Sequence, residues 1–362
     1  MKKFLLFTFL IVVVLFFQSC EQKKKAIGNE DEIFVIADSV EYYDLEASLL
    51  QVFGKIIYTP QPENLFQIRR LPFEKLNSMK RRKNVIIAAP LNSDSQTSNY
   101  IESILSPDVK SLIEMDSAFV FNKYDLWAKD QLVMVLTAPS TEKLNEKILG
   151  NHENLLHYFQ NISNKRLFKS LYNAKYEKKK IEAEILRDHG FIIYVQADFL
   201  LAKNIPEDNF VWLRRAVNSD MERWVFVHYI ENATPEYLNQ DSIASIRNRI
   251  TKRFYQTIDG ESYVEISDNY KTTTEVNFHG RYALYTQGLW RMNDKSMGGP
   301  FLSYMFFDEK TNRIYMLDGS LYAPKYKKRK LIQQIDVTLQ SFKLEHEVPK
   351  DQVEDLLDEL DE

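Results

Sequence analysis

Apolar residues are concentrated at the start of the chain and then recur at regular spacings along it. Lys2 and Lys3 precede the apolar segment FLLFTFLIVVVLFF at residues 4–17. A positive start followed by an apolar stretch of this length is typical of a signal peptide. The stretch is shorter than the roughly 20 residues that a helix needs to span a bilayer, which disfavours the alternative of an uncleaved anchor. We therefore predict a signal peptide at residues 1–19 and leave it out of the predicted fold.

The next part of the chain, residues 32–175, is predicted to form an α+β domain. Short runs rich in β-branched residues are typical of strands, and apolar residues at helical spacing before a Gly are typical of a helix. Strands that alternate with helices favour a sheet with helices on one face. The predicted elements are strands at 32–38 (EIFVIAD) and 84–90 (NVIIAAP), a helix at 42–54 (YYDLEASLLQVFG), and two strands within 118–139 around a polar turn at Lys129 and Asp130.

Residues 140–189 have a helical pattern throughout. The segment begins with the helix start STEKL and ends with His189 and Gly190, a cation followed by a Gly that can terminate a helix. Its charged stretch KYEKKKIEAE, residues 175–184, leaves two interpretations open, a solvated helix face or a surface for a partner helix. We favour the solvated face, because long charge runs are most often solvated.

Residues 176–345 are predicted to form a second α+β domain. Three strands, a long helix, several more strands and the last helix KRKLIQQIDVTLQSFK are typical of an antiparallel sheet with helices at its ends or on one face. The segment FLSYMFFDEKTNRIYMLDGSLYA alternates on both sides of a polar loop and predicts a hairpin. The acidic tail, residues 346–362, predicts a short amphipathic helix or a disordered end. The expected fold is thus two domains, each a mainly antiparallel sheet packed by helices.

The segment GLWRMNDKSMGGPF, residues 288–301, contains three of the 10 glycines of the chain. Its Gly-Gly-Pro sequence can take positive φ and then fix a turn, so it predicts a sharp loop between two strands. In one interpretation the glycines let the backbone bend while the Trp covers the edge of the sheet. In the other the loop binds a partner, because Trp and Arg contribute most of the energy of protein interfaces. The candidate partner-binding residues are Trp290, Arg291, Asp294, Gly298 and Gly299.

Cys20 is the only cysteine of the sequence and follows the apolar run and Ser19. A lone thiol cannot form an internal disulfide. Its position is similar to that of the cysteine in the bacterial lipobox, whose thiol is acylated before cleavage makes it the first residue, although Phe17 stands where the common pattern has Leu. We expect Cys20 to carry a lipid such as palmitate, and the polar residues 20–31 to form a flexible tether. The membrane is therefore the first expected partner.

The charge balance argues against a nucleic-acid partner. Cleavage before Cys20 removes Lys2 and Lys3, which leaves 45 Lys and Arg residues against 51 Asp and Glu residues and changes the formal net charge from −4 to −6. Such a chain has no basic field for a phosphate backbone. The basic run at 325–330 is an ordinary solvated helix start in the favoured interpretation and a contact for anionic lipid head groups in the other.

The sequence has no recognisable catalytic or metal-binding motif. His152 and His157 lie five residues apart, off the four-residue spacing that brings two ligands to one helix face, and HExxH and CxxC are absent. A triad of Ser296, His279 and Asp294 would rest on proximity in the sequence alone. We therefore predict no catalytic residue, no metal and no cofactor.

Two further motifs stand out beside the lipoprotein start: the strand NFVWLRR and the segment FHGRYALYTQGLWRMNDKSMGGPFLSYMFFDEKTNRIYMLDGSLYAPKYKKRK. With them, nearly the whole mature chain resembles an uncharacterised lipoprotein family of the Bacteroidetes, catalogued as domain of unknown function 4837. The resemblance implies a cell-envelope lipoprotein, held at the outer membrane and facing the periplasm, and brings no known activity. At the level of fold only, residues 191–343 are similar to the PsbP-like arrangement, known from an extrinsic photosystem subunit and a Ran-binding import factor.

Two classes of function remain open. The first is a non-enzymatic binding or assembly factor that contacts another envelope component, expected to be a protein, through the C-terminal domain. The second is an envelope hydrolase or carbohydrate-acting enzyme that uses carboxylates such as Asp294, Asp308 and Glu309. Two carboxylates that converge in a deep cleft would favour the enzyme, and a shallow aromatic patch would favour the binding factor.

Overall fold

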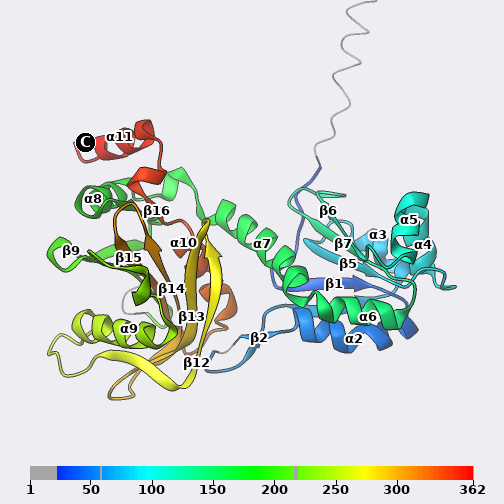
Figure 1. Ribbon diagram of the computed structural model, residues 1–362, viewed down its shortest axis with the longest axis horizontal. Coiled ribbons are helices and arrows are strands. Elements are labelled where there is room, and N and C mark those ends of the chain that lie inside the picture. Colours follow the sequence, from blue (N-terminus) through cyan, green and yellow to red (C-terminus); the bar gives the residue numbers. More distant parts are fainter. Residues whose placement is uncertain (1–22, 58, 216–218, 362) are drawn as a thin grey trace, which may run out of the picture. The chain divides into compact units, whose positions relative to one another are not determined.

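The chain divides into two compact units in a computed structural model that describes residues 23–57, 59–215 and 219–361 (Figure 1). The first unit comprises the residues up to Lys55 together with 66–163. The second comprises 56–65 and everything from Asn164 onward. Residues 56–65 thus belong to the second unit although the chain around them builds the first, a long-range arrangement that no local pattern indicates. The predicted signal peptide and Cys20 lie outside the described residues.

A five-stranded sheet in the order β4-β1-β5-β7-β6 forms the centre of the first unit. β1 pairs in parallel with β4 and β5, β5 pairs in parallel with β7, and β6 and β7 form an antiparallel hairpin. The α+β class is confirmed, but three of the four pairings in this sheet are parallel, because connections that contain helices bring the strands back in the same direction. The strands are β1 (Glu32–Ile36), β4 (Gln67–Leu71), β5 (Asn84–Ala88), β6 (Val120–Tyr124) and β7 (Leu132–Leu136).

Helices cover both faces of this sheet, whereas the sequence predicted helices on one face. Leu76, Ile101 and Ile113 of α3, α4 and α5 join a cluster of buried residues with β5 and β7, while α2 and α6 pack against each other on the other side (Figure 1). Every position of β1, β5 and β7 is buried, as expected for strands covered on both faces. The helices are α2 (Ser39–Phe53), the 3₁₀ helix η1 (Phe73–Lys75), α3 (Leu76–Met79), α4 (Gln96–Ile104), α5 (Pro107–Glu114) and α6 (Thr141–Gly150).

The described end of the predicted tether is bound to the first unit. The N–H of Ala26 donates to the carbonyl of Lys129, and the N–H of Ile27 donates to the carbonyl of Arg81. The flexible tether predicted for residues 20–31 is therefore too long, because its second half has backbone hydrogen-bond partners.

Side-chain and glycine caps set the limits of the charged helical region. The hydroxyl of Ser140 accepts a hydrogen bond from the N–H of Lys143 and so begins α6, and Gly190, with φ 71°, ends α8 in the left-handed conformation. Both ends agree with the sequence. The helical pattern is interrupted, however, because the helices are α7 (His152–Leu171), the 3₁₀ helix η2 (Ala174–Tyr176) and α8 (Lys179–His189).

The second unit is built on a seven-stranded antiparallel sheet in the order β12-β13-β14-β15-β11-β10-β9. The predicted hairpin of β14 and β15 is confirmed. The predicted strand that begins at Phe191 is shorter than expected, since only Phe191 and Ile192 pair, as β8, with β16, and the chain enters the large sheet later, at β9. The strands are β8 (Phe191–Ile192), β9 (Phe199–Ile205), β10 (Phe210–Arg215), β11 (Glu222–Ile230), β12 (Val264–Phe278), β13 (Arg281–Met292), β14 (Gly298–Asp308), β15 (Arg313–Tyr322) and β16 (Lys343–Leu344).

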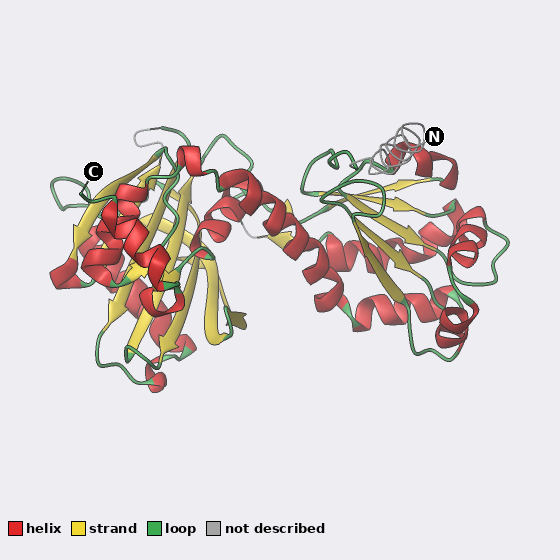
Figure 2. Ribbon diagram, turned by 90° about the horizontal axis from the view of Figure 1, so that it is seen from above, coloured by secondary structure: helices red, strands yellow, loops and turns green. Residues whose placement is uncertain are grey.

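This sheet is also covered on both faces, because β14 and β15 direct apolar side chains to both sides of this sheet, and both of its faces are covered. Leu302 and Phe306 pack with Ile335 of α10 in one core cluster, and Phe301 and Met305 pack with α9 in another. Figure 2 shows helices beside the strands of this unit. The predicted acidic tail forms a helix, α11. The helical elements that follow α8 are η3 (Pro206–Asp208), η4 (Pro235–Tyr237), α9 (Gln240–Phe254), α10 (Arg329–Leu339), η5 (Glu345–Glu347) and α11 (Lys350–Asp358). Among the described residues, no helix is both long enough and apolar enough to span a membrane.

The hairpin of β2 (Ile56–Ile57) and β3 (Glu63–Asn64) supplies a cap for a distant helix. The carboxylate oxygens of Glu63 accept hydrogen bonds from the backbone N–H groups of Lys328, at 2.6 Å, and Arg329, at 3.2 Å. Lys328 itself provides no side-chain cap for α10. Glu63 therefore satisfies the first N–H groups of α10 and places a negative charge at the positive end of its dipole.

Replacing Glu63 with Ala should lower the free energy of unfolding of the second unit by about 1 kcal/mol, the usual cost of losing a helix N-cap. Urea denaturation followed by circular dichroism measures this change. As a matched control, the change Glu309→Ala, at an exposed turn residue, should alter the same value by less than about 0.5 kcal/mol. Equal effects of the two substitutions would contradict the capping role.

Candidate functional site

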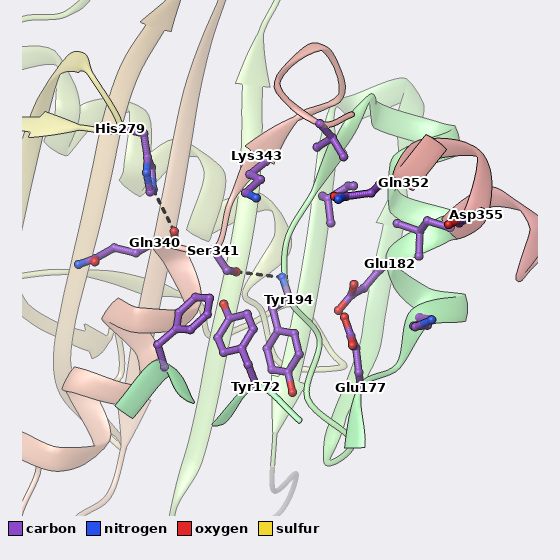
Figure 3. A pocket seen from close by; sticks show the side chains of 15 residues that line it. Tyr172, Glu177, Glu182, Tyr194, His279, Gln340, Ser341, Lys343, Gln352 and Asp355 are labelled. Carbon is purple, nitrogen blue, oxygen red and sulfur yellow. Dashed lines mark hydrogen bonds between the residues drawn. The ribbon is translucent and has the colours of Figure 1, made fainter. Parts of the chain in front are cut away.

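A cavity of about 600 Å³ lies in the second unit. Its walls come from the end of α7, the start of α8, the β8–β16 pair and α11 (Figure 3). A cavity of this size, lined mainly by apolar surface with a few polar groups, has the dimensions of a small-ligand site. This pocket is the candidate functional site.

Three stacked aromatic rings form one wall of the pocket. The ring centroids of Phe168 and Tyr172 are 3.6 Å apart, and those of Tyr172 and Tyr194 are 3.7 Å apart. The hydroxyl of Tyr194 donates to the carbonyl of Leu171 at 2.7 Å, which fixes the ring nearest the protein interior. Phe168, at the other end of the stack, is 40% exposed. The stack therefore extends from the core to the open side of the pocket.

Two carboxyl groups lie next to this wall, those of Glu177 and Glu182 (Figure 3). Glu182 is only 3% exposed, and one of its oxygens accepts the N–H of Val195 at 2.5 Å. Burial raises the pKa of Glu182 to about 9, aided by the hydrogen-bonded carboxyl of Glu177 and opposed by the N–H of Val195. At neutral pH the carboxyl group of Glu182 therefore keeps its proton.

The helical spacing of α8 explains why Glu182 is buried. It lies three and four residues before Ile185 and Leu186, and so on the apolar face of the helix. The interpretation of residues 175–184 as a wholly solvated face is wrong at this position. In the sequence, Glu182 stands at the spacing of the apolar residues of α8, and this spacing could have indicated that it is buried. The neighbouring lysines and glutamates suggested a solvated face instead.

The opposite walls are formed by late segments of the chain. Gln352 and Asp355 line the pocket from α11, and Lys343 lines it from β16 (Figure 3). The ammonium group of Lys179 lies 3.1 Å from a carboxylate oxygen of Glu359, so its charge is already paired. The pocket thus combines hydrogen-bonding groups from α11 with the carboxyl groups of the α8 region.

The structure places Trp290 in the core, which corrects its assignment to a partner-binding loop. Its side chain is 1% exposed, and its indole N–H donates to the carbonyl of Leu321 at 3.2 Å. Its ring centroid lies 4.9 Å from that of Trp224. A side chain buried in this way has no surface to offer a partner, so Trp290 has a structural role.

The other residues of that loop also have structural partners. Arg291 forms ion pairs with Glu265 at 2.9 Å and Asp268 at 3.2 Å. Asp294 accepts hydrogen bonds from the hydroxyl and N–H of Ser296 within the turn, which holds the pKa of its carboxyl below the usual value. These contacts shape the hairpin turn between β13 and β14.

The two candidate glycines are required by close packing rather than by positive φ. Both lie in β14, and the residue of this turn with positive φ is Lys295, at 63°. A Cβ atom on Gly299 would lie 1.9 Å from the carbonyl oxygen of Leu321, and one on Gly298 would lie 2.9 Å from the carbonyl oxygen of Trp290. The glycines therefore allow neighbouring strands to approach, and they define no site.

The carboxylates proposed for catalysis from the sequence are not brought together. Asp308 accepts hydrogen bonds from the N–H and hydroxyl of Thr311 in the turn after β14, and Glu309 is exposed in the same turn. In the triad considered from the sequence, His279 contacts the carbonyl of Gln340 at 2.9 Å, so its ring is engaged away from the bond between Ser296 and Asp294. Among the described residues, no group of three or more His, Cys, Asp or Glu side chains could hold a metal ion.

The chain matches two families whose functions are unknown. Residues 177–341 match the model of a domain of unknown function (DUF4837), and residues 26–172 match that of another (DUF8532). The segment 177–341 thus matches the uncharacterised family that the sequence motifs indicated, and the preceding residues match a second uncharacterised family. No curated protein sequence matches the chain.

Solved structures show only distant likeness. The Ran-binding protein Mog1p of Saccharomyces cerevisiae is 10% identical, with 43% of this chain and 90% of that chain covered and a TM-score of 0.30. A protein of Bacteroides thetaiotaomicron is 5% identical, with 43% of this chain and 45% of that one covered and a TM-score of 0.24. Scores this low carry no argument, and the PsbP-like arrangement stays a prediction.

Replacing Trp290 with Ala should lower the free energy of unfolding by about 3–5 kcal/mol, because it empties a large volume in the core. Replacing Arg291 with Ala should cost less than about 1 kcal/mol, since it removes partly exposed ion pairs. Urea denaturation of the full chain, followed by circular dichroism, compares the two variants. A small effect of Trp290→Ala would restore the interpretation of this residue as a docking side chain.

Proposed function

We propose that the protein is a lipid-anchored binding factor of the cell envelope that holds part of another envelope component in the pocket of its second unit. The observation that carries this proposal is the pocket itself, with its stacked aromatic wall and its few polar groups. The proposed binding site is therefore the pocket with walls from α7, α8 and α11, and no longer the loop at residues 288–301.

The geometry of the carboxyl groups supports binding better than hydrolysis. Glycosidases place two carboxyl groups roughly 5–9.5 Å apart, with the scissile bond between them. Here the carboxyl groups of Glu177 and Glu182 are hydrogen-bonded to each other, and the backbone of Val195 holds Glu182 in place. No substrate bond fits between groups in direct contact. The pair is suited to recognising a ligand in the wall of the pocket.

The anchor proposed for this factor is a lipid on Cys20. The sequence before it has the organisation of a signal peptide, and the lone cysteine stands where a lipobox places it. One lipid-modified residue and a short segment would hold both units at the outer membrane on its periplasmic side. A binding factor held there would stay close to other components of the cell envelope.

Replacing Cys20 with Ser should abolish acylation and release the protein from the membrane fraction. Metabolic labelling with a fatty-acid analogue and fractionation of cells measure these two effects, and the matched control is Ser19→Ala, which keeps a small residue before the cysteine. Labelling or membrane retention that persists in Cys20→Ser would refute the anchor.

Filling the pocket should remove binding without disturbing the fold. Gln352 and Glu354 are both exposed on α11, and only Gln352 lines the pocket. In cells, chemical crosslinking followed by mass spectrometry should recover an envelope component with the wild type and with Glu354→Trp. Its recovery should fall at least tenfold with Gln352→Trp at equal abundance. Unchanged recovery with Gln352→Trp would show that the pocket is not the binding site.

A further inference from the structure

The charges that face the pocket are unevenly distributed along its walls. Lys179 is paired with Glu359, and Lys343 lies apart from Glu177 and Glu182 (Figure 3). Among the described residues no ion pair joins Glu177 or Glu182 to a cation of the protein, although Lys179 lies close enough to lower the pKa of Glu182. The titratable groups that face Glu182 or line the same pocket are Glu177, Lys179, Tyr172, Tyr194, His279, Lys343 and Asp355.

The aromatic stack stands beside this carboxyl pair and offers a complementary surface. Tyr194 lies next to Glu177 and Glu182 in the pocket, and Tyr172 lies on the other side of Tyr194 (Figure 3). Ile192 and Leu356 add apolar surface. The stack supplies apolar contact surface, and a carboxylate attracts an ammonium group more strongly in a partly dehydrated site than in water. An apolar group that ends in an ammonium would match both parts of the wall.

We infer that the pocket binds an amine-bearing group, with its ammonium against the carboxyls of Glu177 and Glu182 and its apolar portion along the rings of Phe168 and Tyr172. This inference rests on the proposed function, because it names the chemical class that the same pocket takes. Asp355, from α11, adds a further carboxylate to the lining.

Binding of an ammonium should release a proton. The pKa of Glu182 is about 9 in the free protein, so at pH 7.5 this carboxyl is protonated. A bound cation favours the ionised form and lowers that pKa. The protonated carboxyl then loses its proton to solvent, and the second carboxylate formed in this way faces the ammonium. The affinity should therefore rise with pH below 9, by at most about tenfold per pH unit.

Isothermal titration calorimetry of the mature chain tests this, with phenethylamine as the probe and 2-phenylethanol as its neutral counterpart. We expect phenethylamine to bind at least tenfold more tightly than the alcohol at pH 7.5. Titrations in two buffers that differ in heat of ionisation should show that a proton is released. Between pH 6.5 and 8.5 the affinity of the wild type should rise, and that of Glu182→Gln should stay level.

Matched variants assign the effect to the carboxyl pair. Glu177→Gln should reduce the preference for the amine to less than about threefold, and Glu354→Gln, on the exposed side of α11, should leave it unchanged. Circular dichroism establishes that each variant is folded. Equal binding of amine and alcohol, no binding of the amine, or an undiminished preference in Glu177→Gln would each overturn the inference.

The experiments distinguish failure of the proposed binding function from failure of the inferred amine ligand. If Gln352→Trp loses its crosslinked component while phenethylamine does not bind, the pocket is the binding site and its ligand belongs to another class. If phenethylamine binds as expected while Gln352→Trp keeps every crosslinked component, the pocket takes amines and the envelope component binds elsewhere.

Discussion

The structure depends on one constraint: each sheet has two apolar faces, and both must be covered. In the first unit every position of β1, β5 and β7 is buried, and in the second unit β14 directs apolar residues to both sides. A sheet of this kind is stable in water only between two layers of helices. Segments far apart in the sequence must then return to the same sheet, and the chain order of helices and strands follows from that requirement.

The pocket follows from the way in which the helices α8 and α11 pack at the large sheet. α8 packs its apolar face toward the large sheet, and α11 packs on α8 without a fully buried side chain of its own. Both helices contribute residues to the walls of the pocket, together with the aromatic stack. Glu182 is buried because it lies on the face of α8 that turns inward, and the N–H of Val195 compensates part of the cost. The same packing that completes the fold therefore places the protonated carboxyl group of Glu182 in a wall of the cavity.

A second pair of buried ionisable residues compensates the cost of burial in a different way, through an ion pair. Arg247 of α9 and Asp318 of β15 are both fully buried, and the guanidinium donates to both carboxylate oxygens, at 2.6 and 3.2 Å. The guanidinium also lies 3.8 Å from the ring centroid of Phe301. Such a pair adds little to stability once its desolvation is counted. Its fork-like geometry instead sets the position of α9 on the sheet. Glu182 forms no ion pair among the described residues and keeps its proton, because burial raises its pKa.

Local patterns determined the elements of this protein, and distant contacts decided the site. Hydrophobic spacing predicted the strands β1, β5, β14 and β15, and capping residues predicted the start of α6 and the end of α8, because these depend on neighbours in the chain. The sequence did not predict parallel pairing in the first unit or the hairpin that caps α10 through Glu63, and it left open whether Trp290 is buried. Each depends on contacts between segments that lie far apart, such as Glu63 with Lys328 and Trp290 with Leu321. The sequence by itself determined the α+β class and showed that the chain has a single cysteine, Cys20. Only the tertiary structure decided which charged residue is buried, because burial depends on what packs against a residue and not on its neighbours in the chain.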